Sequence, residues 1–208
     1  MGAELEHEFP LFPLGIVALP GELIPLHIFE ERYKTMMNEC LAGDREFGIV
    51  WLSDDGLRTN GCAARIDRVL ERMDDGRMNL LSRGTRVFRT VERQAHLAYP
   101  AGIVEFVADD DDRVDAGLLA TAHDAYTDLV KRATDRDPET TDLTEMGSYE
   151  MAATVDFGLD VKQGLLDLRS ENARLRLVTR LFRAALKRLD FVDRAQARAR
   201  SNGKVRFG

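Results

Sequence analysis

The hydrophobic pattern changes its period once along the chain, at four consecutive aspartates at 109–112. Before them, short runs rich in β-branched and aromatic residues are bounded by glycine, proline or aspartate, which is typical of strands. After them, apolar residues recur at three- and four-residue steps, which is typical of amphipathic helices. The sequence therefore predicts an α+β chain with a β-rich lobe at 1–112, a helical lobe at 113–193 and a frayed basic tail at 194–208.

A hairpin is the clearest local prediction in the first half. Apolar and polar residues nearly alternate over 64–73, Asp75 and Gly76 supply a pair that accepts positive φ, and 77–82 returns, so a two-residue turn is expected. Further strand-like runs occupy 16–19, 47–52, 86–91 and 102–107.

Helices are expected at 29–41, among the strands, and throughout the second half. Oxygen-bearing side chains at helix starts accept hydrogen bonds from the first backbone N–H groups, and they therefore mark these starts. The expected starts are Asp115, Ser148, Asp160 with Gln163 as a capping box, and Ser170 ahead of the longest helix.

Four prolines in the first 25 residues remove backbone donors, so this stretch cannot be central strand throughout. Pro20 and Gly21 suit a tight turn. Leu23 and Ile24 lie between this turn and Pro25, which predicts a loop that exposes both side chains. An exposed apolar pair is a candidate binding surface, although the same pair could plug the end of a barrel.

The net charge of −7 is unevenly spread, because residues 180–208 carry nine Lys or Arg against two Asp. A basic tail makes nucleic-acid binding an alternative function. The acidic remainder would repel phosphates, however, and the tail offers only Phe191 and Phe207 for base stacking, so nucleic acid is not the favoured partner.

Cofactor and metal signatures are missing from the sequence. The only Gly-Lys pair is Gly203-Lys204, followed by Val205 rather than by a phosphate-loop Ser or Thr, and the four histidines lack ligand spacing. Cys40 and Cys62 lie in apolar segments, which predicts buried reduced thiols. With an acidic start and no apolar run of 18 residues, the expectation is a cytoplasmic, non-catalytic protein without metal, cofactor or membrane segment.

Several segments of the first half occur together in a recognisable order. They are FPLFPL at 9–14, LPG at 19–21, PLHIFE at 25–30, RY at 32–33, FGIV at 47–50, DGR at 75–77, GTRVFR at 84–89 and AGIVE at 101–105, with KQGLLD at 162–167 in the helical half. The order resembles the substrate-binding domain at the front of Lon proteases, over about residues 8–190. Glu31 stands where that family usually has proline, and Cys62 where threonine is common.

This resemblance implies a PUA-like pseudo-barrel of strands followed by a helical bundle, and a role in binding polypeptide segments or a partner protein. A groove between the lobes is the expected place. The candidate peptide-binding residues are Leu23, Ile24, Pro25, Trp51 and Tyr99. A tryptophan in the setting of Trp51 more often packs in the core or the sheet than serves as a ligand platform. The alternatives to peptide binding are an RNA-binding PUA-like protein, an adaptor with a dedicated partner, or a small-molecule pocket.

Purified protein is expected to hydrolyse neither ATP nor casein, since the sequence offers no phosphate loop and no nucleophile with its activating base. Phosphate release and casein cleavage assays test this expectation. Turnover that survives several orthogonal chromatography steps would contradict it.

Overall fold

The structure is a computed structural model that describes residues 5–110, 113–136, 143–144 and 146–202. It divides into two compact units, Met1–Asp112 with Tyr149–Ser170 and Arg113–Ser148 with Glu171–Gly208. The first of these segments ends at Asp112, at the aspartates where the sequence predicts a seam, and the predicted lobe boundaries stay a prediction. Residues 149–170 belong with the first unit, however, which differs from the single helical lobe predicted at 113–193.

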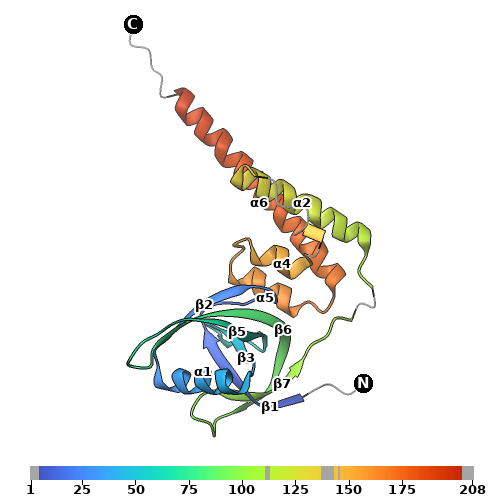
Figure 1. The fold of residues 1–208 in the computed structure, drawn as a ribbon. Helices are drawn as coiled ribbons and strands as arrows, with labels where there is room; N and C mark the ends of the chain where they lie inside the picture. The colour runs from blue at the N-terminus through green and yellow to red at the C-terminus, as the bar shows by residue number, and fades with distance from the viewer. Residues whose placement is uncertain (1–4, 111–112, 137–142, 145, 203–208) are drawn as a thin grey trace. The chain divides into compact units, whose positions relative to one another are not determined.

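A closed sheet forms the body of the first unit (Figure 1). The strand order is β1-β7-β6-β5-β3, and β1 also pairs with β3 in parallel, which returns the sheet to its first strand. These strands are β1 (Leu5–Leu14), β3 (Phe47–Ser53), β5 (Asn60–Arg72), β6 (Met78–Gln94) and β7 (Ala101–Phe106). All their other pairings are antiparallel, so the α+β class and the predicted pseudo-barrel of strands are confirmed.

The barrel interior is organised around the ring of Phe88, which is fully buried. Phe9 meets it edge-on at 5.5 Å between ring centroids. A Cβ atom on Gly48 would lie 2.4 Å from the Phe88 ring, and one on Gly61 would lie 2.7 Å from it. Since contacts that short are prohibited, glycine is required at both positions for β3 and β5 to close over this ring.

Two predicted strands of the first half differ from the structure. Residues 78–82 and 86–91 fall in one long strand, β6, which continues through Gly84. A Cβ atom on Gly84 would lie 2.1 Å from the carbonyl oxygen of Leu19, so this position requires glycine. The strand predicted at 16–19 is wrong. Val17, Ala18 and Leu19 are buried outside any strand, so their apolar character reflects core packing.

The loop predicted at Leu23 and Ile24 is also wrong, because β2 (Leu23–Ile28) pairs along its length with β6. Alternation along this strand leaves Leu23 47% exposed and buries Ile24 at 5%. Among the residues that the structure describes, β2 pairs on one side only, so Pro25 is tolerated as an edge-strand proline.

The β5–β6 hairpin is confirmed, but its turn has three residues rather than two. The Gly76 N–H donates to the Met73 carbonyl and the Met73 N–H donates to the Arg77 carbonyl, both at 2.9 Å. Only Gly76 takes positive φ, at 82°, and Asp75 does not. This is a type I turn followed by a left-handed glycine, which is the usual three-residue hairpin.

Helix α1 (Glu31–Gly43) follows β2 and begins two residues later than predicted. It buries the predicted face of Tyr33, Met36, Met37 and Cys40 against the barrel unit. Burial raises the pKa of the Cys40 thiol to about 11 and raises that of Cys62 as well, and neither cysteine forms a disulfide.

Helix α5 (Leu159–Asp167) is tied to the barrel by side chains of the KQGLLD segment. The Lys162 ammonium lies 2.6 Å from a carboxylate oxygen of Glu22, and the Gln163 amide donates to the Asn60 carbonyl at 3.2 Å. The predicted capping box of Asp160 with Gln163 is therefore wrong, since the helix begins after Gly158 and Gln163 is used for docking. Helix α4 (Ser148–Ala153) starts at the predicted Ser148.

The second unit contains the helices α2 (Ala116–Thr134) and α6 (Glu171–Asn202). The predicted Asp115 cap is confirmed, because its carboxylate accepts from the N–H groups of Gly117 and Leu118. Tyr126 and Phe182 pack with ring centroids 5.4 Å apart.

The tail predicted to fray after Asp193 is helical as far as Asn202, and 203–208 lie outside the described residues. The Ala, Arg and Gln residues of this stretch are strong helix formers, which explains why the helix continues without an apolar stripe. None of the described helices has both the length and the apolar character needed to cross a membrane.

Replacing Gly76 with valine is expected to destabilise the protein by about 1–2 kcal/mol, since a β-branched residue resists positive φ. The nearest atom to an added Cβ is Lys34 Cδ at 3.6 Å, so the effect comes from the backbone and not from crowding. Urea unfolding measures the change. Gly164→Ala is the matched control, since it lies in α5 in open space and should be neutral or stabilising. Equal stabilities for the two variants would contradict the turn assignment.

Candidate functional site

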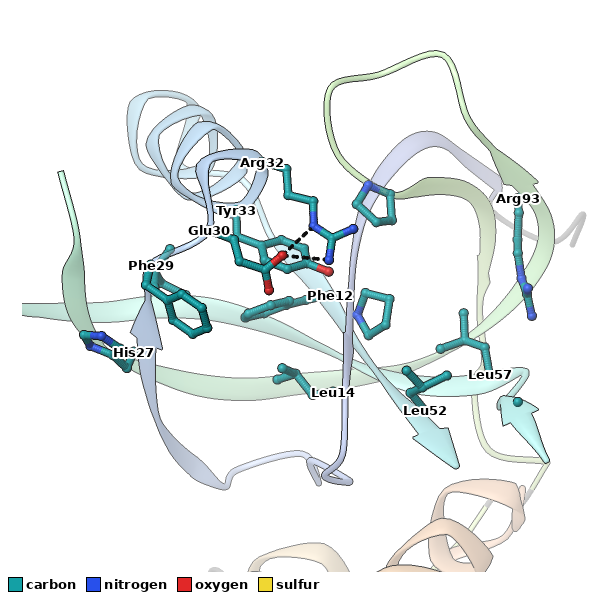
Figure 2. A pocket seen from close by; sticks show the side chains of 14 residues that line it. Phe12, Leu14, His27, Phe29, Glu30, Arg32, Tyr33, Leu52, Leu57 and Arg93 are labelled. Atoms are coloured by element: carbon teal, nitrogen blue, oxygen red, sulfur yellow. Dashed lines mark hydrogen bonds and ion pairs between the residues drawn. The ribbon is translucent and has the colours of Figure 1, made fainter. Parts of the chain in front are cut away.

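A hollow of about 720 Å³ opens in the first unit, where β1 and β2 end and the β3–β4 hairpin projects (Figure 2). Strand β4 (Gly56–Leu57) pairs with the end of β3 and brings Leu57 opposite Leu52. The lining residues are Phe12, Pro13, Leu14, His27, Ile28, Phe29, Glu30, Arg32, Tyr33, Leu52, Gly56, Leu57, Arg93 and Pro100.

Aromatic rings form the buried part of this hollow. Phe12 and Tyr33 are 5% and 6% exposed, and their ring centroids lie 4.4 Å apart. Burial raises the pKa of the Tyr33 hydroxyl; the nearby Arg32 opposes this shift and Glu30 adds to it. The hydroxyl therefore stays protonated at neutral pH, and the two buried rings together carry no charge.

Large apolar side chains also stand exposed at its edge. Phe29 is 58% exposed and Leu52 is 53% exposed. Phe29 follows the last residue of β2 and stacks against the ring of His27 at 5.8 Å. Exposed apolar groups beside a concave apolar surface are the usual signature of a binding site.

The polar groups of the hollow are already oriented by neighbours. Arg32 forms a two-pronged contact with Glu30 Oε2, at 3.0 Å from Nε and 2.8 Å from Nη2, and its guanidinium lies 4.5 Å from the centre of the Tyr33 ring. Arg32 is therefore largely neutralised by its own neighbour.

His27 is held by a hydrogen-bond chain. The Asn79 amide nitrogen donates to Glu71 at 2.8 Å, so its oxygen faces His27 Nδ1 at 2.7 Å and must accept from it. Nδ1 consequently carries a proton, and in the neutral ring Nε2 is left as an acceptor.

A second hollow of about 390 Å³ adjoins the first and shares lining residues with it, namely Pro13, Arg32, Leu57, Arg93 and Pro100. The segment 94–101 forms its other wall. Tyr99 lies in this wall, 5% exposed, and donates its hydroxyl to Glu39 of α1. That bond, together with burial, fixes the position of the wall relative to α1.

A third hollow, of about 570 Å³, has His27 in common with the first and is lined by Pro25, Leu26, Leu70, Glu71, Asn79 and Leu80. Leu70 is 54% exposed there. The three hollows thus follow one another across the unit, through shared residues at each step.

The five residues predicted from the sequence are dispersed by the structure. Tyr99 lines the second hollow and Pro25 the third. Leu23, Ile24 and Trp51 line none of the three; Trp51 is half-buried and packs under the Arg58 guanidinium at 5.0 Å. Their role in peptide binding stays a prediction.

Sequence reasoning missed Phe12, Phe29, Arg32, Leu52 and Arg93. The first three belong to segments that carried the family resemblance, which was a signal for them. Leu52 and Arg93 had no such signal, since their exposure depends on how the barrel closes. Within the described part of the chain, no three His, Cys, Asp or Glu residues are placed to hold a metal ion.

The first unit thus combines a closed barrel with three adjoining hollows in which several polar groups are held by their neighbours. The chain belongs to the family of the ATP-dependent protease La (LON) substrate-binding domain, whose sequence profile matches residues 8–184. The predicted resemblance is confirmed.

Relatives of the chain include the Lon protease of Flavobacterium johnsoniae, 24% identical over 95% of this chain and 26% of that protein. Lon protease 2 of Myxococcus xanthus is 26% identical over 92% of this chain and 26% of its own length. The chain therefore spans about a quarter of these relatives.

Among solved structures, the chain is similar to a Lon N-terminal domain protein from Xanthomonas campestris, with a TM-score of 0.64 and 25% identity over 82% of this chain and 95% of that one. The N-terminal domain of a Mycobacterium avium complex Lon protease shares the fold, with a TM-score of 0.62 and 16% identity over 84% of this chain and 97% of that one.

The buried tyrosines of the site predict a loss of stability at alkaline pH. Burial is the largest cause of the raised pKa of Tyr99, and the hydrogen bond to Glu39 raises this pKa further. Burial also raises the pKa of Tyr33. In the unfolded chain both ionise near pH ~10, so above that pH unfolding releases protons and the free energy of unfolding falls.

Urea unfolding at pH 8 and near pH 11 measures this fall. Tyr99→Phe removes one of the two groups and should make the fall smaller, even though it lowers stability at pH 8 by about 1 kcal/mol through loss of its hydrogen bond. An equal fall in both proteins would contradict the assignment.

Proposed function

We propose that this chain binds extended polypeptide segments through their apolar side chains, in the hollow lined by Phe12, Phe29 and Leu52, without catalysis of its own. One observation carries the proposal: two large apolar side chains stand more than half exposed beside a concave surface built on buried aromatic rings. Exposing such groups to water is unfavourable unless a ligand covers them.

The size of the hollow suits this ligand. Binding cavities typically measure about 300–1,000 Å³ and are lined mainly by apolar and aromatic side chains with a few polar groups. At about 720 Å³ the first hollow accommodates one or two large side chains, and its neighbours of about 390 and 570 Å³ continue the same surface. A series of hollows fits an extended chain better than one compact small molecule.

The expected affinity is modest. Full burial of a Phe or Leu side chain contributes about 1.5–3 kcal/mol, and the exposed halves of Phe29 and Leu52 contribute less. Because association and ordering of the peptide cost several kcal/mol, dissociation constants on the order of micromolar or weaker are expected. No nucleotide is required.

The family supports a recognition role, since its profile is described as a substrate-binding domain and the relatives are named Lon proteases. Because the chain matches about a quarter of those relatives, their protease activity does not transfer to it. The ligand is therefore taken to be polypeptide, bound and not cleaved.

The double variant Phe29→Ser/Leu52→Thr should weaken binding of an alkylated, permanently unfolded protein by about 1–3 kcal/mol in total, since it removes both exposed apolar contacts. Both side chains are more than half exposed, so the melting temperature should change little. Fluorescence anisotropy gives the affinity and differential scanning fluorimetry the stability.

The matched control is Leu23→Ser/Val91→Thr. These side chains are 47% and 54% exposed but line none of the three hollows, so binding should be unchanged. Weakened binding in the control with intact binding in the first variant would move the site to the edge strand β2, where the sequence had placed Leu23.

A further inference from the structure

Strand β6 carries four arginines, and three of them are paired with carboxylates. Arg83 faces Asp67 at 3.7 Å, Arg86 faces Glu46 at 3.0 Å, and Arg89 is in contact with Glu105. The fourth, Arg93, forms no ion pair with any residue that the structure describes. The guanidinium of Arg93 is therefore not neutralised by a carboxylate of the described part of the chain.

The position of Arg93 makes this charge relevant to ligands. It is one of the residues shared by the first and second hollows, so it lies where they meet. Figure 2 shows it at the opposite end of the first hollow from His27 and Phe29. The other arginine shared by both hollows, Arg32, is already engaged by Glu30. Arg93 is therefore the one guanidinium of the paired hollows left to meet an incoming anion, among the described residues.

Resting on the proposed function, we propose that the site selects segments in which an acidic side chain lies between apolar ones, with Arg93 receiving the carboxylate. A guanidinium presents a planar fork of donors that matches a carboxylate with two parallel hydrogen bonds. The apolar walls beside it, Leu57 and Pro100, displace water and strengthen that contact.

An internal Asp or Glu fits the geometry better than a chain terminus. Apolar surface continues on both sides of Arg93, through the first hollow toward Phe29 and through the second toward Tyr99. A polypeptide that ended at Arg93 would fill one of these hollows and leave the other empty. A segment that passes through fills both, and it presents an acidic side chain at the junction.

The net negative charge does not oppose this selection. At physiological ionic strength the screening length is about 8 Å, so distant carboxylates act weakly and the contact partner dominates. Selection should accordingly be local: one carboxylate at the right position is favoured, whereas a run of acidic residues gains nothing more.

Four short synthetic peptides test the proposal. Three are amidated and place Asp, Asn or Lys between Phe-Leu and Leu-Phe; the fourth has Asn in the centre and a free C-terminal carboxylate directly after the last Phe. The wild-type protein should bind the Asp peptide about tenfold more tightly than the Asn peptide, as expected for one partly exposed charge-assisted contact. The Lys peptide should bind most weakly.

Arg93→Gln should bring the affinities of the Asp and Asn peptides to within about twofold of each other, while the Asn peptide binds as it does to the wild type. Arg65→Gln is the matched control, because Arg65 is exposed on β5, has no ion pair with a described residue and lines none of the three hollows. It removes the same charge and should preserve the tenfold preference.

The outcomes separate this inference from the function on which it rests. Equal binding of the Asp and Asn peptides to the wild type would overturn the inference and leave polypeptide binding intact. Preference for the peptide with the free carboxylate would also overturn it, in favour of terminus recognition. If Arg65→Gln also lost the preference for the Asp peptide, the preference would come from the overall charge of the protein and not from Arg93, which would overturn the inference. No binding of any peptide would overturn both proposals.

Discussion

Closure of the barrel depends on the ring of Phe88, which occupies space that any side chain on Gly48 or Gly61 would need. With both glycines in place, β3 and β5 approach this ring closely, and β3 reaches β1 to form the parallel pairing that ends with Leu14 opposite Trp51. A single added methyl group would force the ring or the strands apart, at a cost typical of overpacked cores, about 1–3 kcal/mol or more. The positions of the residues at the strand ends, which line the hollows, follow from this closure.

The hollows are a consequence of where the closed strands end. Phe12 and Leu14 belong to the end of β1, and Leu52 to the end of β3, so their meeting depends on the β1–β3 pairing. The β2–α1 junction contributes Phe29, because alternation along β2 buries Ile28 and the chain then turns outward into the helix. On the same unit, Lys162 and Gln163 hold α5 against the barrel through Glu22 and Asn60, so the KQGLLD segment serves docking and not the hollow.

Sequence patterns predicted the elements better than the site. Alternation over 64–73 was sufficient for a hairpin, but its turn type depends on which residue must adopt positive φ, and only Gly76 does. Pro25 suggested a loop because a proline interrupts a strand that is paired on both sides. The unpaired edge of β2 accepts the proline, and the register of β2 against β6 exposes Leu23 while burying Ile24. The lining residues come from segments near 12, 29, 52 and 93, and no local pattern joins positions that only barrel closure brings together.

Photo-crosslinking from inside the hollow tests the central claim most directly. A benzophenone side chain placed at Leu52 should crosslink an alkylated, unfolded protein on irradiation, and an excess of unlabelled unfolded protein should compete the crosslink away. The same group placed at Val91, equally exposed but outside the hollows, should give little product. Equal crosslinking from both positions, or efficient crosslinking from Val91 alone, would contradict the account of this hollow as the polypeptide-binding site.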